Sequence, residues 1–201
     1  QPGIYYITGE SLDAVRNAPF LEKLKKKGYE VLFMVDAIDE YAMQQLREFK
    51  EKKMICVTKE NLNLEDDEEE KKKLEEEKKE FDELCVLVKE VLGDKVTEIK
   101  ASTKLKTHPV CLSSDGAISL EMERVLGAMP GAEGHMMAER ILEINGNHPI
   151  FERLKTLYDT DRDQLASYAS LLYDQALLIE GLPVSDPVAF SEQVCKLMAN
   201  A

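Results

Sequence analysis

The sequence predicts a small three-layer α/β domain in residues 1–93, followed by an α+β domain in residues 94–201 that ends in two helices. Three observations support this fold class. Strand-like apolar runs alternate with helix signals in the first part, a pattern typical of parallel strands joined by right-handed crossovers. A highly charged segment then carries apolar residues at helical spacing. Beyond Gly93, short strands give way to two amphipathic helices.

The first part contains three expected strands and the helices between them. Ser11 can cap a helix, because its hydroxyl accepts hydrogen bonds from free backbone N–H groups at a helix start. Gly28 suits the left-handed position after a helix. Because Val31–Val35 is continuously apolar, we expect a strand buried on both faces. The expected elements are a strand at Ile4–Thr8, a helix from Leu12, a helix at Pro19–Lys27, a strand at Val31–Val35, a helix at Asp39–Phe49 and a strand at Met54–Thr58.

The charged segment predicts one long helix, about Asp66–Leu92, that ends before Gly93. Residues 65–83 contain 12 acidic and 5 basic residues, with opposite charges four positions apart. Such pairs stabilise exposed helical turns. We therefore expect solvated first turns and packed last turns. The expected packed face consists of Leu74, Phe81, Leu84, Val88 and Val91.

The second part combines short strands with helices. We expect Gly181 to close the first of the two terminal helices. The expected elements are strands at Val96–Ser102 and Val110–Ser114, a short helix at Ser119–Leu126, a loop at Met129–His135, a strand at Ile141–Ile144, and helices at His148–Tyr158, Asp161–Glu180 and Asp186–Asn200.

The sequence contains no convincing catalytic, cofactor or metal site. Gly9 is the lone glycine of the turn after the first strand, and Glu10 would repel phosphate, so we interpret this turn as a helix cap and not a nucleotide site. The histidines are isolated from one another and from cysteines at ligand spacing. Cys111 follows His108 by three residues, but on a strand their side chains point to opposite faces. The charged run lacks a calcium loop.

The charge balance excludes several partners. The chain carries 39 acidic and 26 basic residues, a net charge of −13. This disfavours binding to nucleic acid or to anionic membranes, and no apolar stretch approaches the length of a membrane span. The four cysteines are widely spaced, so we expect reduced, buried thiols and a cytoplasmic location. The start at Gln1, without methionine, suggests a piece of a longer protein.

Two surfaces remain open to more than one interpretation. The terminal helices carry wide apolar stripes, which form either an intramolecular core or a self-complementary four-helix interface between two copies. The methionines at 122, 129, 136 and 137 are either core filling or an adaptable surface. The stripe residues are Leu165, Tyr168, Leu172, Ala176 and Ile179 on the first helix, and Phe190, Val194, Leu197 and Met198 on the second.

Several motifs resemble the heat-shock protein 90 chaperones. The resemblance covers nearly the whole chain and corresponds to the end of the middle domain plus the C-terminal dimerisation domain. The motifs are Ile4-Tyr5-Tyr6-Ile7-Thr8-Gly9-Glu10, Ile38-Asp39-Glu40-Tyr41, Gln44-Gln45-Leu46-Arg47-Glu48-Phe49, Met122-Glu123-Arg124, His148-Pro149-Ile150 and Leu171-Leu172-Tyr173-Asp174-Gln175-Ala176-Leu177-Leu178.

The resemblance implies a homodimer and a surface that contacts client proteins during folding. In this family the terminal helices form a four-helix dimerisation bundle, and the segment after the Met-Glu-Arg motif faces clients. The ATP and Mg²⁺ site lies in an N-terminal domain that these residues do not match, so we expect neither a cofactor here nor ATP hydrolysis by this chain alone. The expected client-contact residues are Met122, Val125, Leu126, Met129, Met136 and Met137.

The chain departs from the family pattern in several places. Residues 1–107 resemble eukaryotic cytosolic members, whereas the remainder resembles bacterial ones, and the acidic tail that recruits tetratricopeptide co-chaperones is missing. Pro130 and Gly131 interrupt what would be a longer helix. Two alternatives stay open beside the chaperone interpretation. One is a small α/β enzyme or nucleotide-binding domain with a pocket near Gly9, and the other is a structural spacer.

Overall fold

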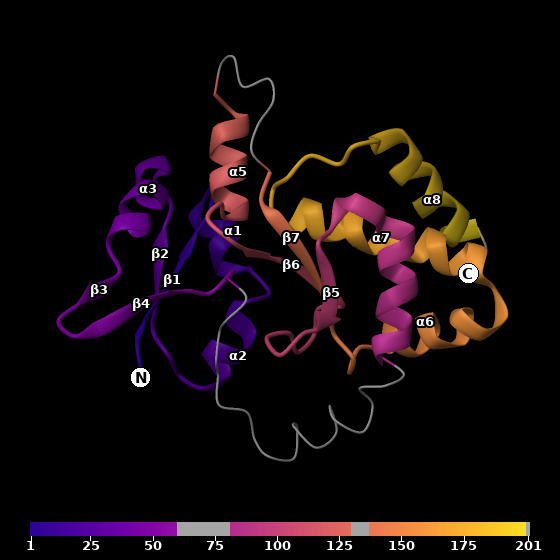
Figure 1. Ribbon diagram of the computed structural model, residues 1–201, viewed down its shortest axis with the longest axis horizontal. Coiled ribbons are helices and arrows are strands. Elements are labelled where there is room, and N and C mark those ends of the chain that lie inside the picture. Colours follow the sequence, from indigo (N-terminus) through magenta and orange to yellow (C-terminus); the bar gives the residue numbers. More distant parts are fainter. Residues whose placement is uncertain (60–80, 130–136, 200–201) are drawn as a thin grey trace. The chain divides into compact units, whose positions relative to one another are not determined.

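The protein was analysed as a computed structural model that describes residues 1–59, 81–129 and 137–199 (Figure 1). The chain forms two compact units, each built from separate segments. The first comprises Gln1–Asn63, Lys104–Lys106 and Ser113–Arg140, and the second Leu64–Thr103, Thr107–Leu112 and Ile141–Ala201. The domain boundary expected after residue 93 stays a prediction.

The first unit contains a four-stranded sheet in the order β2-β1-β4-β3. The central strand β1 pairs in parallel with both β2 and β4, which confirms the α/β pattern expected from the sequence. Strand β3 pairs antiparallel with β4. The strands span Ile4–Thr8 (β1), Val31–Met34 (β2), Glu48–Phe49 (β3) and Lys52–Cys56 (β4).

Local signals correctly mark the start of α1 and the end of α2. The Ser11 hydroxyl accepts a hydrogen bond from the Ala14 N–H at 3.2 Å and caps α1, as expected. Gly28 has a φ of +69°, the left-handed conformation expected after α2. The helices span Leu12–Arg16 (α1), Leu21–Lys26 (α2) and Ala37–Gln45 (α3).

The expected helix at Asp39–Phe49 is wrong at its C-terminal end. Helix α3 stops at Gln45, and Phe49 belongs to β3, which turns back into β4. The two residues of this turn, Lys50 and Glu51, have φ values of +49° and +65°. A two-residue turn with positive φ at both positions normally carries Asn-Gly. Because neither residue occurs there, the sequence offers no hairpin signal.

The expectation that Val31–Val35 is buried on both faces is also wrong. Strand β2 lies at the edge of its sheet, and Leu32 is 47% exposed. A continuous apolar run is typical of a central parallel strand. Here β2 has that composition at an edge position.

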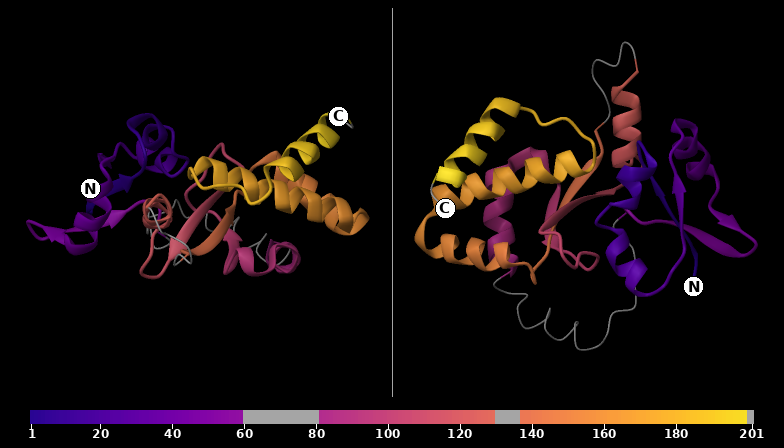
Figure 2. Two further views of the ribbon diagram at one scale, coloured as in Figure 1. Left: turned by 90° about the horizontal axis from the view of Figure 1, so that it is seen from above. Right: turned by 180° about the vertical axis from the view of Figure 1, so that it is seen from behind.

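The second unit contains helices and most of a three-stranded sheet in the order β5-β7-β6. The strands and helices expected after Gly93 are confirmed, with shifts of up to two residues at their ends. Helix α7 packs against both α6 and α8 (Figure 2). The elements span Glu98–Ala101 (β5), Val110–Asp115 (β6), Glu139–Ile144 (β7), Pro149–Thr160 (α6), Arg162–Ile179 (α7) and Pro187–Ala199 (α8).

The last turns of the expected charged helix are helical and packed. Residues 81–92 form a helix, and Phe81, Leu84 and Val88 are buried as expected, whereas Val91 is 37% exposed, so its assignment to the packed face was wrong. The ring of Phe81 stacks on Phe151, with centroids 4.9 Å apart. The earlier part of Asp66–Leu92, including Leu74, lies outside the described residues. So does the expected loop Met129–His135 apart from Met129.

Candidate functional site

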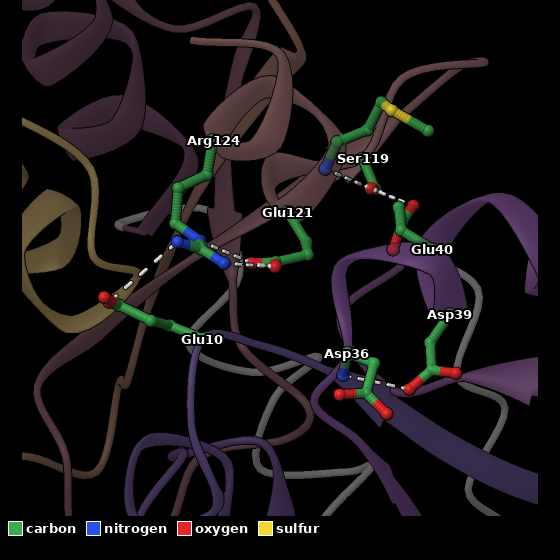
Figure 3. Close-up of polar contacts among 8 residues, drawn as sticks. Glu10, Asp36, Asp39, Glu40, Ser119, Glu121 and Arg124 are labelled. Atoms are coloured by element: carbon green, nitrogen blue, oxygen red, sulfur yellow. Dashed lines mark hydrogen bonds and ion pairs between the residues drawn. The ribbon is translucent and has the colours of Figure 1, made fainter. Parts of the chain in front are cut away.

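The segment that resembles a client-contact element begins with α5, Leu120–Gly127, which belongs to the first unit. The Ser119 hydroxyl caps this helix by accepting a hydrogen bond from the Met122 N–H at 3.0 Å. The same hydroxyl donates to the Glu40 carboxylate on α3 at 2.5 Å (Figure 3). Both side chains are buried, with Glu40 6% and Ser119 3% exposed. The start of α5 is thereby fixed to α3.

An arginine links the first turns of α5 to the loop after β1. The Arg124 guanidinium donates to both carboxylate oxygens of Glu121, at 2.8 and 2.6 Å, and lies 4.0 Å from Glu10 (Figure 3). The hydrogen bond to Glu121 raises the pKa of Arg124, and the charges of Glu121 and Glu10 act in the same direction, while burial opposes them. Arg124, Glu121 and Glu10 therefore tie the polar face of α5 to the loop after β1.

Glu123 of α5 contacts Ala138 and Arg140. Its carboxylate accepts a hydrogen bond from the Ala138 N–H at 2.9 Å and pairs with Arg140. Both charged side chains are 11% exposed, so little solvent screens the pair. Glu123 therefore holds residues Ala138 and Arg140 against α5.

The expected client-contact residues fall into two groups. Met122 and Val125 lie on the buried face of α5, and Leu126, in the same helix, is half-buried. Met129 is 46% and Met137 62% exposed. Met136 lies outside the described residues. The exposed methionines therefore lie outside α5, Met129 two residues after its end and Met137 directly before Ala138.

The expected dimer residues are also divided by burial. Leu165, Leu172 and Ala176 are buried within this chain, and Ile179 and Met198 are 41% and 74% exposed. The remaining members are half-buried: Tyr168, Phe190, Val194 and Leu197. Two further apolar side chains that the stripe omitted, Leu178 and Val188, are 52% and 69% exposed. Val188 directly follows Pro187, the first residue of α8.

A groove of about 410 Å³ separates α7 from α8. Its wall includes Tyr168, Leu171 and Leu197, together with polar side chains of both helices. The Gln193 side-chain oxygen is buried and accepts no hydrogen bond from the described residues. The two terminal helices are therefore incompletely packed against each other.

The turn at Gly9 has a structural explanation. A Cβ atom at Gly9 would lie 2.6 Å from a methyl carbon of Val15 on α1, and the Gly9 N–H donates to the Met34 carbonyl at 3.1 Å. The glycine is needed for close packing of helix on strand. Within the described ranges, no three metal-ligating side chains of the His, Cys, Asp or Glu type come together.

The cysteines are free thiols, but they are not all buried. Cys56, Cys85 and Cys111 are buried as expected, whereas Cys195 on α8 is exposed. The expectation was wrong for Cys195 because α8 leaves that face uncovered within this chain. Burial raises the pKa of Cys85 to about 12, and the charges of Asp82 and Glu98 add to this.

No helix among residues 1–59, 81–129 and 137–199 has the length and apolar character needed to cross a bilayer.

Comparison with known proteins identifies relatives along the whole chain. The model of the Hsp90 protein family matches residues 1–201. Chaperone protein HtpG of Halalkalibacterium halodurans is 46% identical over 199 residues, that of Bacillus velezensis 46% over 198, and that of Clostridium acetobutylicum 48% over 198. These matches cover 98 to 99% of this chain but 31% of each relative. With the family matched from the first residue to the last, the chain belongs to the heat-shock protein 90 family.

Proposed function

We propose that this chain is the dimerisation and client-contact part of an Hsp90-type chaperone. It spans about a third of the length of its chaperone relatives, 31% of each. Two features support the proposal, namely an apolar terminal helix with little cover and a pair of exposed methionines beside α5. Dimerisation would hold two protomers together so that the rest of each chain acts at a high effective concentration.

The observation that best supports the proposal is the exposure of α8, which the rest of this chain covers only in part. None of the thirteen residues of this helix is buried in the chain. Yet the helix carries five large apolar side chains, Val188, Phe190, Val194, Leu197 and Met198. Fully burying one such side chain is worth about 1.5–3 kcal/mol. A second copy of the α7–α8 pair supplies a matching apolar surface, because a two-fold axis brings the same face of each copy together.

Charge substitutions on α8 test this interface. We expect Val188→Glu and Met198→Glu to weaken dimerisation by about a hundredfold, because each would bury a carboxylate without a partner. The measurement is sedimentation equilibrium at micromolar concentration. Leu172 is unsuitable, since it is buried within the chain and its replacement by Glu would disturb folding itself.

Val86→Glu is the matched control. Val86 is 60% exposed on the helix of residues 81–92, and it receives the same charge on the same unit. The control should leave the dimer intact. Dimers of unchanged affinity in both α8 variants would contradict the interface.

Client contact is supported by the exposure of Met129 and Met137. Methionine is flexible and polarisable, so a pair of exposed methionines adapts to apolar segments of different shape. Met129 lies two residues beyond the end of α5, and Met137 directly precedes Ala138, whose N–H donates to Glu123 of α5.

The chain should act without cofactor and without hydrolysing ATP by itself. This expectation rests on the match to one part of the family's length, and it applies to the isolated chain. Soluble clients in the cytoplasm, rather than nucleic acid or membranes, are the proposed partners, in keeping with the net charge of −13. The alternatives of a small enzyme or a spacer have no specific support from the described residues.

A further inference from the structure

The hydroxyl of Ser119 serves two hydrogen bonds at once. It accepts from the Met122 N–H, which caps α5, and it donates to Glu40 Oε1 (Figure 3). Hydrogen bonds in such a chain polarise one another, so a carboxylate that accepts from the hydroxyl makes its oxygen a better acceptor for the helix N–H. The cap of α5 therefore depends on a residue of α3.

Glu40 is buried near the Tyr6 hydroxyl. It is 6% exposed, and its neighbours include Tyr6 of β1 and, beyond it, Cys56 of β4. Burial raises the pKa of the Tyr6 hydroxyl, and the Cys56 thiol and the Glu40 carboxylate raise it further. A buried carboxylate is costly unless it accepts hydrogen bonds. The bond from Ser119 offsets that cost, so α3 and α5 stabilise each other.

The position of α5 determines where the exposed methionines lie. Met129 follows α5 directly, and Glu123 on α5 accepts the hydrogen bond from the Ala138 N–H, next to Met137. A shift of α5 therefore moves both side chains. All of these residues belong to the first compact unit.

We propose that Glu40 is a positioning residue for the client-contact surface, which it holds in place by fixing the Ser119 hydroxyl at the start of α5. The proposal rests on the client contact proposed above. In this proposal, the Ile38-Asp39-Glu40-Tyr41 motif does not touch the surface formed by Met129 and Met137. It acts on that surface through α5.

A pair of isosteric substitutions at Ser119 tests the proposal in the full 201-residue chain. Ser119→Asn and Ser119→Asp both retain a good helix cap. The Asn amide can donate to Glu40, whereas the Asp carboxylate faces it with a like charge. We expect backbone hydrogen exchange in α5 to be about tenfold faster in Ser119→Asp than in Ser119→Asn.

Rescue separates positioning from a general loss of stability. Adding Glu40→Gln to Ser119→Asp removes the repulsion and supplies a donor, so exchange in α5 should return to the Ser119→Asn rate. Asp39→Asn is the control on the same helix, because Asp39 accepts from the Asp36 N–H at 3.1 Å and caps α3 itself. It should leave exchange in α5 unchanged.

The same variants are then assayed for suppressing aggregation of thermally denatured malate dehydrogenase. Suppression should fall in Ser119→Asp, return with Glu40→Gln, and fall in a Met129→Ser, Met137→Ser double variant. Equal α5 exchange in Ser119→Asp and Ser119→Asn, or no rescue by Glu40→Gln, would overturn the positioning role. If exchange responds as expected but the methionine variant suppresses aggregation normally, the proposed client contact is contradicted and the link from Glu40 to α5 is supported.

Discussion

Single residues in this protein acquire their roles from neighbours that are distant in sequence. Met122 and Met129 are seven positions apart and chemically identical, yet the first is 5% and the second 46% exposed. Sequence spacing grouped them, but Met122 lies within α5, which packs against α3, whereas Met129 lies beyond the end of that helix. The Glu121–Arg124 pair, three positions apart on one helix, was detectable from its spacing. Glu40 was not, because a glutamate in a helix is normally solvated.

The thiols should differ sharply in reactivity. At pH 8, Cys195 should react with iodoacetamide, whereas Cys85 should stay unmodified because it is buried and its raised pKa, about 12, leaves little thiolate. Mass spectrometry of peptides after timed labelling gives the rates. Cys195→Ser should abolish the fast reaction. Rapid labelling of Cys85 in the folded chain would contradict its burial.

At the scale of elements, local signals predicted the helices and strands well. The cap at Ser11 was predicted, and the side chains of Ser11, Ser119 and Asp161 each accept a hydrogen bond at the start of their helix. The hairpin between β3 and β4 was missed. Its turn residues carry no hairpin signature. In addition, Leu46 and Phe49 continue the helical spacing of apolar residues beyond the end of α3, which caused the wrong prediction.

The hairpin turn should accept a stabilising substitution. Replacing Lys50-Glu51 by Asn-Gly should raise the free energy of unfolding by about 1 kcal/mol, because both positions have positive φ values that Asn and Gly adopt at lower cost. Urea unfolding of the chain measures the change. Lys52→Asn, which removes a positive charge beside the turn, should give no such gain. A loss of stability in the Asn-Gly variant would argue against this turn geometry.

For the whole molecule, charge and apolar surface act against each other. Every copy carries a net charge of −13, so electrostatic repulsion would oppose the proposed association of two copies through their apolar helices. The sequence revealed this charge fully, together with the amphipathic pattern of α7 and α8. It did not reveal which side chains the chain itself covers, because stripes that pack inward and outward have the same spacing.

Dimerisation should therefore strengthen with salt. Raising NaCl from about 10 to about 150 mM shortens the screening length from roughly 30 to 8 Å, which reduces repulsion between the copies while leaving apolar contacts in place. Sedimentation equilibrium at the two concentrations measures the dissociation constant. A dimer that weakens as salt increases would indicate that ion pairs, and not apolar contacts, dominate the interface.

The Glu123 carboxylate also has a consequence for how this protein can vary. By accepting a hydrogen bond from the Ala138 N–H and pairing with Arg140, it holds the start of β7 against α5. An engineer could therefore insert a foreign peptide between Met129 and Met137 and expect α5 and the start of β7 to keep their contact, provided that Glu123 is retained.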